Sequence, residues 1–111
     1  MFEKNLNVGY LLDFYGDILP ERKRSVMDMY YNEDFSLAEI AAEIGISRQG
    51  VRDIIKKSED ELFFYEEKLG LAKKLKNAEE SLDKLEHITK GLALPEDYFA
   101  RFSELKQIIS Q

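Results

Sequence analysis

Apolar residues recur at helical spacing in two short runs between Ser36 and Lys57, and a glycine separates the runs. The first run is Leu37, Ile40, Ala41 and Ile44, and the second is Val51, Ile54 and Ile55. Ser36 and Ser47 stand where the N-caps of two helices are expected, and Glu39 completes a capping box with Ser36. Gly45 follows the first run, where a left-handed residue commonly ends a helix. The pattern predicts two short helices joined by a tight turn.

The turn has the residues that a steep crossing of two helices needs. Ala41 lies four residues before Gly45, where only a small side chain fits between the helices. Ile46 is placed to fill the wedge between them, and Val51 and Ile54 to anchor the second helix. This combination is typical of the helix-turn-helix motif, whose second helix enters the major groove of DNA. The residues expected to build the motif are Ser36, Ala41, Gly45, Ser47, Val51 and Ile54.

Two further amphipathic helices are predicted before the motif. The first covers residues 4–19, ends at Gly16 and Pro20, and has as its apolar side Leu6, Tyr10, Leu11, Phe14, Tyr15 and Ile18. The second begins at Pro20, which is favourable in a first turn, and its apolar side is Val26, Met27, Tyr30 and Tyr31. Both are expected to cover the core of the motif. Stacking of the first helix's aromatic residues on bases is the alternative.

The helical pattern continues after the motif. It predicts that the second helix of the motif runs to about Lys68 through Leu62, Phe63, Tyr65 and Leu69, and that Gly70 breaks or bends it. A repeat at spacings of four and three then follows, comprising Leu71, Leu75, Ala78, Leu82, Leu85, Thr89 and Leu92. Such a repeat indicates a coiled-coil-like seam, which faces either another protomer or the chain's own domain. We expect a homodimer, because a lone helix would leave Leu71, Leu75, Leu82 and Leu85 in water.

A last helix is predicted after Gly91, starting at Pro95. Its apolar side is Tyr98, Phe99, Phe102, Leu105, Ile108 and Ile109. No segment alternates apolar and polar residues as a strand would, so the expected class is all-α. The 111 residues are expected to form a helix-turn-helix domain over 1–69 and a helical extension over 70–111.

The amino-acid composition argues against catalytic and metal sites. The chain has no cysteine and one histidine, His87, with no partner at a metal-ligand spacing. Adjacent acids such as Glu66 and Glu67, or Glu79 and Glu80, diverge on a helix and are expected to be solvated. We therefore predict no enzyme and no catalytic, cofactor or metal site. The sequence has no signal peptide pattern and no apolar run near the ~20 residues that span a bilayer, so a cytoplasmic protein is expected.

The charge of the chain weakens the expectation of DNA binding. The formal net charge is −6. Residues 20–58 hold seven basic and seven acidic residues, whereas residues 59–111 hold eight basic and twelve acidic ones. Most DNA-binding modules carry a basic surface, because neutralising phosphates supplies most non-specific affinity. The segment with the motif is neutral instead.

The outward positions of the second motif helix are the candidate DNA contacts: Arg48, Gln49, Gly50, Arg52, Asp53, Lys56 and Lys57. Arginine can read guanine, glutamine adenine, and an aspartate can accept from cytosine N4. Gly50 is expected to leave room for close approach to the backbone. Lys56 and Lys57 are expected to hold phosphates. A second basic cluster, Arg22, Lys23 and Arg24, either contacts phosphates or is simply a solvated helix start.

Several segments resemble one family. The segments DFYGDIL at 13–19, MYYNEDFSLAEIAAEIGISRQGVRDIIKKSEDEL at 29–62 and YEEKLGL at 65–71 are similar to the YlxM-type (UPF0122) family of small bacterial helix-turn-helix proteins. More distantly, residues 19–41 resemble the promoter-reading final domain of sigma factors. The resemblance implies an all-helical cytoplasmic protein of Gram-positive type bacteria, with an auxiliary or regulatory role linked to the signal recognition particle.

Two functions remain open from the sequence. In the first, the protein is a DNA-binding regulator that uses the outward residues of the motif. In the second, the motif is a scaffold, and the protein binds the protein or RNA of the signal recognition particle or a transcription complex. The excess of acidic residues after residue 58 favours a basic protein partner in the second case.

Overall fold

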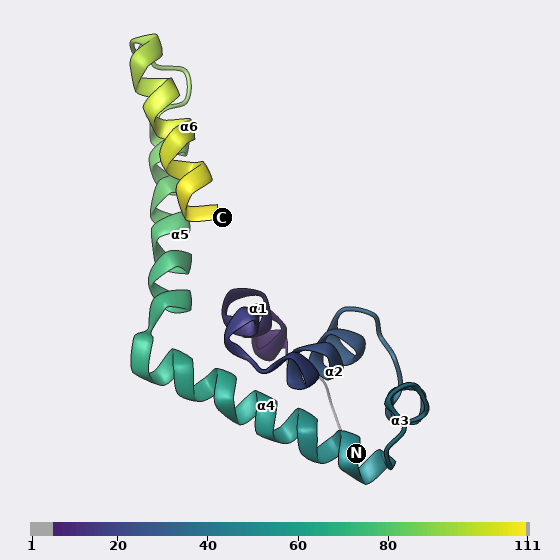
Figure 1. Ribbon diagram of the computed structural model, residues 1–111. Coiled ribbons are helices and arrows are strands. Elements are labelled where there is room, and N and C mark those ends of the chain that lie inside the picture. The colour runs from purple at the N-terminus through teal and green to yellow at the C-terminus, as the bar shows by residue number, and fades with distance from the viewer. Residues whose placement is uncertain (1–5, 111) are drawn as a thin grey trace. The chain divides into compact units, whose positions relative to one another are not determined.

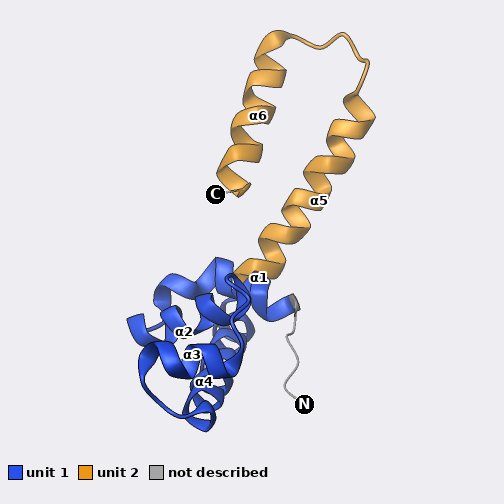
Figure 2. Cartoon of the chain, turned by 90° about the vertical axis from the view of Figure 1, so that its right-hand side faces the viewer, with its two compact units in different colours: residues 1–70 blue, residues 71–111 orange. Residues whose placement is uncertain are grey.

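The computed structural model describes residues 6–110, and within this range all regular secondary structure is helical, with no strand (Figure 1). The elements are α1 (Leu6–Tyr15), the 3-10 helix η1 (Gly16–Ile18), α2 (Glu21–Tyr31), α3 (Leu37–Ile44), α4 (Arg48–Leu69), α5 (Leu71–Thr89) and α6 (Glu96–Ser110). The predicted all-α class is confirmed. The chain divides into two compact units, residues 1–70 and residues 71–111 (Figure 2).

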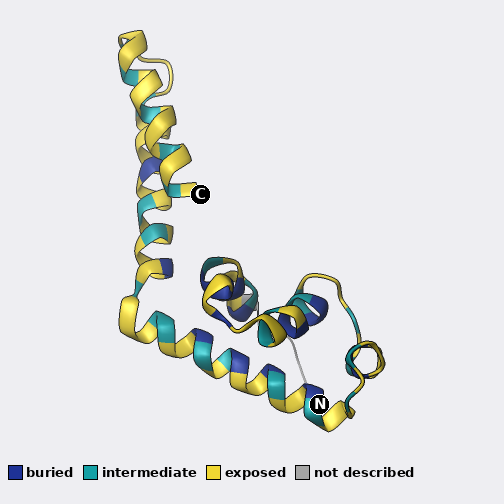
Figure 3. Ribbon diagram, viewed as in Figure 1, coloured by how far each residue is buried: buried dark blue, intermediate teal, exposed yellow. Residues whose placement is uncertain are grey.

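Helix α4 is the central element of the first unit. Helices α1, α2 and α3 all pack against it, and its inner side is buried along most of its length (Figure 3). The buried residues of α4 are Val51, Ile55, Ser58 and Leu62, at spacings of four, three and four. The hydroxyl of Ser58 is satisfied inside the helix, because Oγ donates to the carbonyl of Ile54 at 2.7 Å. The buried side of the amphipathic helix α4 is thus the surface against which the other three helices pack.

Not every apolar residue that predicted the continuation of α4 lies on its buried side. Phe63 is 42% exposed and Leu69 is 54% exposed. Phe63 follows the buried Leu62 by one residue, which turns it about 100° away from the core. Leu69 is the last residue of the helix. The helix ends where predicted, because Gly70 has a left-handed backbone with φ 64°.

Two predicted core positions before α2 are wrong. Tyr10 is 36% exposed and Ile18 is 54% exposed. Helix α1 ends at Tyr15 and continues as a 3-10 turn, whose tighter winding breaks the 3.6-residue period that placed Ile18 inside. The residues of this segment that fill the core are Val8, Leu11, Leu12, Tyr15 and Leu19. From α2 the core receives Val26, Met27, Met29 and Tyr30, whereas Tyr31 is half-buried.

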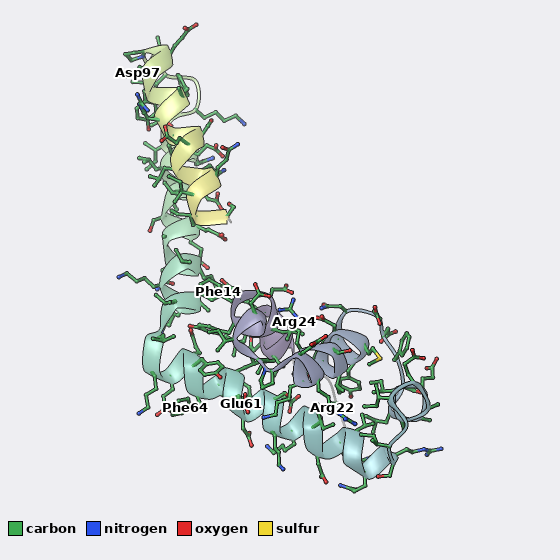
Figure 4. All side chains as sticks on the ribbon, in the orientation of Figure 1. Phe14, Arg22, Arg24, Glu61, Phe64 and Asp97 are labelled. Atoms are coloured by element: carbon green, nitrogen blue, oxygen red, sulfur yellow. The ribbon has the colours of Figure 1, made fainter. Side chains whose placement is uncertain are left out.

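An arginine fixes the 3-10 turn to α2. The Nη1 of Arg24 donates to Oδ1 of Asp17 at 2.8 Å, and its Nε donates to Oδ2 of Asp28 at 3.0 Å. These bonds, first the one with Asp28, raise the pKa of Arg24 above its ordinary value. A Cβ on Gly16 would lie 2.3 Å from Nη1 of Arg24. Any side chain there would displace the guanidinium of Arg24, which is labelled in Figure 4, from this position.

Acidic residues of α4 bind the helices that cover it. The hydroxyl of Tyr15 donates to Oε1 of Glu66 at 2.6 Å, and that of Tyr31 donates to Oε2 of Glu59 at 2.5 Å. Lys23 of α2 forms an ion pair with Glu61. The expectation that Glu66 is merely solvated is therefore wrong. The acids after the motif serve partly to hold α1 and α2 on α4.

The second unit is a hairpin of two antiparallel helices, α5 and α6 (Figure 2). Leu82 of α5 is buried at 8% exposure, and the side of α6 near it is half-buried through Tyr98, Phe102, Lys106 and Ile109. The Nζ of Lys106 lies 3.6 Å from Oδ1 of Asp83 and 3.3 Å from Oε1 of Glu86. Part of the leucine repeat of α5 therefore packs within the chain. The predicted dimer seam is not confirmed and stays a prediction.

Candidate nucleic-acid interface

The first motif helix, α3, begins with the predicted capping box. The Oγ of Ser36 accepts from the backbone N–H of Glu39 at 3.0 Å, and Oε1 of Glu39 accepts from the backbone N–H of Ser36 at 3.0 Å. Two N–H groups that the helix cannot bond are thereby satisfied. The hydrogen bond from the Ser36 backbone, followed by that with its side chain, lowers the pKa of the Glu39 carboxyl.

The turn between α3 and α4 has the predicted left-handed glycine. Gly45 has φ 75° and ψ 35°, and its N–H donates to the carbonyl of Ala41 at 2.9 Å. The N–H of Ile46 donates to the same carbonyl at 3.1 Å. Nothing lies within 4 Å of the position that a Cβ on Gly45 would occupy. The backbone conformation, and not crowding, therefore requires glycine at this position.

Helix α4 begins at the predicted N-cap. The Oγ of Ser47 accepts from the backbone N–H of Gly50 at 3.0 Å. Behind it, Val51 is fully buried, Ala41 is 9% exposed and Ile54 is half-buried. The two helices of the motif are in contact. Every residue predicted to build the motif thus lies in its predicted place, with Ile54 at the edge of the core.

Gly50 has a packing role in the motif besides the one expected. A Cβ on Gly50 would lie 3.2 Å from Cδ1 of Ile46 and 3.3 Å from Oγ of Ser47. Such contacts are tighter than ordinary packing, so glycine at this position makes room for Ile46 within the turn. Gly50 is half-buried. The packing of the motif therefore accounts for a glycine here, and the close approach of DNA to it stays a prediction.

The other candidate DNA contacts lie on the outer side of α4. Exposed side chains there are Arg48, Gln49, Arg52, Asp53, Lys56 and Lys57. Two contacts run along the helix: Nε2 of Gln49 donates to Oδ1 of Asp53 at 3.0 Å, and Nζ of Lys56 lies 3.4 Å from Oδ1 of Asp60. Within residues 6–110, Arg48 and Lys57 form no ion pair. The outer face is therefore polar and only weakly basic.

The second basic cluster is mostly neutralised inside the first unit. Lys23 is paired with Glu61, and Arg24 with Asp17 and Asp28. Arg22 is exposed and has no ion pair with any residue in 6–110 (Figure 4). A single arginine of this cluster thus remains available for a phosphate.

The charge of the chain is divided unevenly between the units. Residues 1–70 hold nine basic and fifteen acidic residues, a net −6, whereas residues 71–111 hold seven of each, a net 0. The acidic excess counted over residues 59–111 lies in residues 59–70, which hold five acids and one lysine. Three of those acids, Glu59, Glu61 and Glu66, bind α1 and α2. The second unit is therefore not an acidic surface.

Sequence patterns could not reveal these acid contacts. Tyr15 and Glu66 are 51 residues apart, and Tyr31 and Glu59 are 28 apart. No local signal pairs residues at such separations.

Across the described range, no group of three or more His, Cys, Asp or Glu side chains is arranged to hold a metal ion. No helix of that range is long and apolar enough to cross a membrane.

Comparisons with known proteins agree with the geometry of the motif. A family described as "Putative helix-turn-helix protein, YlxM / p13 like" matches residues 2–100. UPF0122 protein BH2485 of Halalkalibacterium halodurans is 43% identical over 105 residues, covering 95% of this chain and 96% of the relative. UPF0122 protein YlxM of Bacillus subtilis is 42% identical over 106 residues, covering 96% of each. A UPF0122 protein of Clostridium kluyveri is 49% identical over 79 residues, covering 71% of each.

Proposed function

The chain belongs to the YlxM-like UPF0122 family of helix-turn-helix proteins, and on this basis we propose that it is a DNA-binding regulator. The observation that carries the proposal is the complete motif, with both N-caps, the left-handed Gly45 and an exposed outer side on the first turns of α4. In other proteins this arrangement presents the second helix to the major groove. The role proposed is binding, without catalysis.

The outer residues of α4 supply the chemistry of recognition. Arg48 and Arg52 can each donate two hydrogen bonds to a guanine edge, and Gln49 can form a pair of bonds with adenine. The bond between Gln49 and Asp53, 3.0 Å long, holds the two side chains next to each other. Asp53 can then accept from a cytosine amino group while Gln49 reads a neighbouring base. Lys57 and Arg22 are the phosphate contacts that we assign.

The electrostatics predict modest affinity. Asp53 and Asp60 offset part of the positive charge of α4, and residues 1–70 carry a net −6. Non-specific DNA binding depends on cations that displace counterions from phosphates. This protein therefore depends on base contacts, or on a partner, more than most helix-turn-helix proteins do.

Selection from a random DNA library at about 0.1 M salt tests the proposal, because specific complexes survive at this ionic strength while long-range attraction is largely screened. Arg48→Ala and Arg52→Ala are each expected to weaken binding to an enriched site by ~1–3 kcal/mol. Lys57→Ala is expected to lower affinity for all sequences and to flatten the salt dependence. Lys68→Ala, at the far end of the same helix, is the control and should change nothing. If no sequence is enriched, the proposal fails.

The alternative proposal is an interaction module of the signal recognition particle, with the motif as a scaffold. The observation that favours it is the weakly basic character of the outer face, where Asp53 bonds Gln49 and Asp60 pairs with Lys56. Binding assays with the purified protein and RNA of the particle would test it. In this case Arg48→Ala and Arg52→Ala should reduce binding to the particle while DNA selection yields nothing.

Self-association and location complete the proposal. We propose that the protein is a homodimer, since a two-fold dimer carries two motifs and suits a two-fold DNA site. Either role, on chromosomal DNA or on the signal recognition particle, would place the protein in the cytoplasm.

A further inference from the structure

The hairpin of α5 and α6 leaves large apolar side chains in water. Leu85 is 43% exposed and Ile88 is 70% exposed on α5, and Leu105 is 45% exposed and Ile108 is 62% exposed on α6. By contrast, Leu82 is the one large apolar residue of these two helices that is buried in the described range. Figure 3 shows how much of both helices is exposed.

These four residues lie on one side of the hairpin. On α5, Leu85 and Ile88 follow the buried Leu82 by three and six residues, and on α6, Leu105 and Ile108 follow the half-buried Phe102 by the same steps. Each step of three residues turns the side chain by about 60° in the same sense around its helix. Because the two helices are antiparallel, equal turns on both bring the side chains to the same side of the hairpin. We name this side the apolar face, defined by Leu85, Ile88, Leu105 and Ile108.

The opposite side of the hairpin is more polar, although it carries one exposed aromatic side chain, Phe99, which is 45% exposed. Lys106 lies there, with its Nζ near the carboxylates of Asp83 and Glu86. Ser103 is also exposed on that side, one residue after Phe102. The hairpin thus has one side with a paired charge cluster and a single exposed phenylalanine, and one side on which four large apolar side chains are exposed.

We propose that a second copy of this chain covers the apolar face, so that two hairpins form a four-helix bundle. This inference rests on the homodimer proposed above and names the surface through which the two copies bind. The surface is the apolar face of both helices, and not a seam along α5 alone. A two-fold contact is self-complementary, because the same face meets itself.

The exposed area fits a dimer. Each of the four side chains leaves roughly 100 Å² in water, which gives about 400 Å² on one side of the hairpin. This is the size of the largest apolar patch on a typical monomer, and such patches are often functional. A standard interface needs about 800 Å² per partner, so the apolar face supplies about half and its polar rim the rest.

The charge of the hairpin also favours a second copy. Residues 71–111 hold seven basic and seven acidic residues, so two copies of this unit do not repel each other. A nucleic acid would require a basic surface, and a strongly charged protein partner would require a surface of the opposite sign. Four-helix bundles bury their apolar sides in this way.

Light scattering coupled to gel filtration of the full chain, without DNA, tests the inference. The wild-type chain of 13.0 kDa should elute as a dimer at micromolar concentration. Leu105→Lys and Ile108→Lys should each raise the dissociation constant at least about ten-fold, because each would place a charge in the apolar contact. Ser103→Lys adds the same charge to the other side of α6 and should remain within about two-fold of the wild type.

A second measurement separates loss of the contact from loss of the fold. Leu105→Lys and Leu105→Glu chains, each monomeric alone, should form a heterodimer and recover helix content by circular dichroism when mixed. A wild-type monomer would overturn the inference. Dimers that persist in both lysine variants, equal dissociation of Ser103→Lys, or no recovery on mixing would also overturn it. Because no DNA is present, such a failure would leave the DNA-binding proposal standing, and failed DNA selection would leave the dimer standing.

Discussion

Both units are built from amphipathic helices, but the apolar sides of these helices are buried in the first unit and largely exposed in the second. In the first unit the inner side of α4 is closed, and Val51, Ile55 and Leu62 are all at 0% exposure. In the second unit α5 has one buried leucine, Leu82, and α6 has no buried residue in the described range. The difference follows the helices that cover each element: α1, α2 and α3 pack on α4, whereas α6 packs on α5. An apolar stripe becomes a core only when enough neighbours cover it.

The two units differ in how complete their cores are. The first unit is complete by itself and can hold the motif in a fixed geometry. The second unit buries few of its apolar side chains, and the proposed contact with a second copy would cover more of them. The predictions below test this contrast, from the largest expected effect to the smallest.

Truncation of a core side chain in each unit should have unequal costs. Ile55→Ala removes a fully buried side chain and should lower the free energy of unfolding of the first unit by ~2–5 kcal/mol. Leu82→Ala should cost clearly less, because the hairpin can close part of the space. Urea denaturation followed by NMR signals of each unit would measure both. Equal costs would contradict the contrast.

Alanine at two glycines of the first unit should have opposite effects. Gly45→Ala places a side chain at φ 75°, and should destabilise the first unit by ~1–2 kcal/mol. Gly9 lies within α1, with nothing within 4 Å of an added Cβ, so Gly9→Ala should stabilise by ~0.5–1 kcal/mol. Thermal unfolding of the two variants would measure this difference. If Gly45→Ala were neutral, the turn geometry described here would be incorrect.

Removal of a tyrosine hydroxyl should matter in the first unit only. Tyr31→Phe removes the hydrogen bond to Glu59 and should cost ~1 kcal/mol. Tyr98 of α6 contacts Phe99 and Phe102 through its ring. Tyr98→Phe keeps the ring and should leave stability nearly unchanged. Chemical denaturation of both variants is the measurement, and a larger effect of Tyr98→Phe would reverse the comparison.

The smallest effect concerns pH. The pKa of Glu39 is lowered below its ordinary 4.5 in the folded protein by its bonds with Ser36. Because the folded pKa lies below the unfolded one, the charged Glu39 stabilises α3 above the unfolded pKa, and this stability is lost as pH falls through the folded pKa. An NMR titration should find the Glu39 carboxyl below 4.5 and Ser36→Ala should raise its pKa. A wild-type value at or above 4.5 would contradict the capping box.

The sequence predicted the motif residue by residue because its signals are local. Ser36 with Glu39, Gly45 and Ser47 act on their own neighbours in the chain, and each has the conformation that its type prefers. The ends of α4 and α5 could be predicted in the same way, because Gly70 and Gly91 follow them and have positive φ. Helix caps and left-handed glycines can be read from a few consecutive residues.

Other features depend on tertiary structure and could not be predicted from periodicity. The 3-10 turn after Tyr15 changes which residues of the first segment are buried. The reason for a glycine at position 50 is the neighbouring side chain of Ile46, and the reason at position 16 is the side chain of Arg24. Within the candidate site, exposure of the outer residues followed from the helical period, but the bonds that offset Lys56 and Arg24 depend on side-chain geometry.

Amide hydrogen exchange of the full chain tests the contrast between the units most directly, because it reports local stability along the whole sequence. The wild-type chain and Leu105→Lys would be compared at the same micromolar concentration. We predict that the amides of α4 from Val51 to Leu62 are protected equally in both chains, whereas those of α5 and α6 are protected in the wild type and exchange rapidly in Leu105→Lys. Equal protection of α5 and α6 in the two chains would contradict the account.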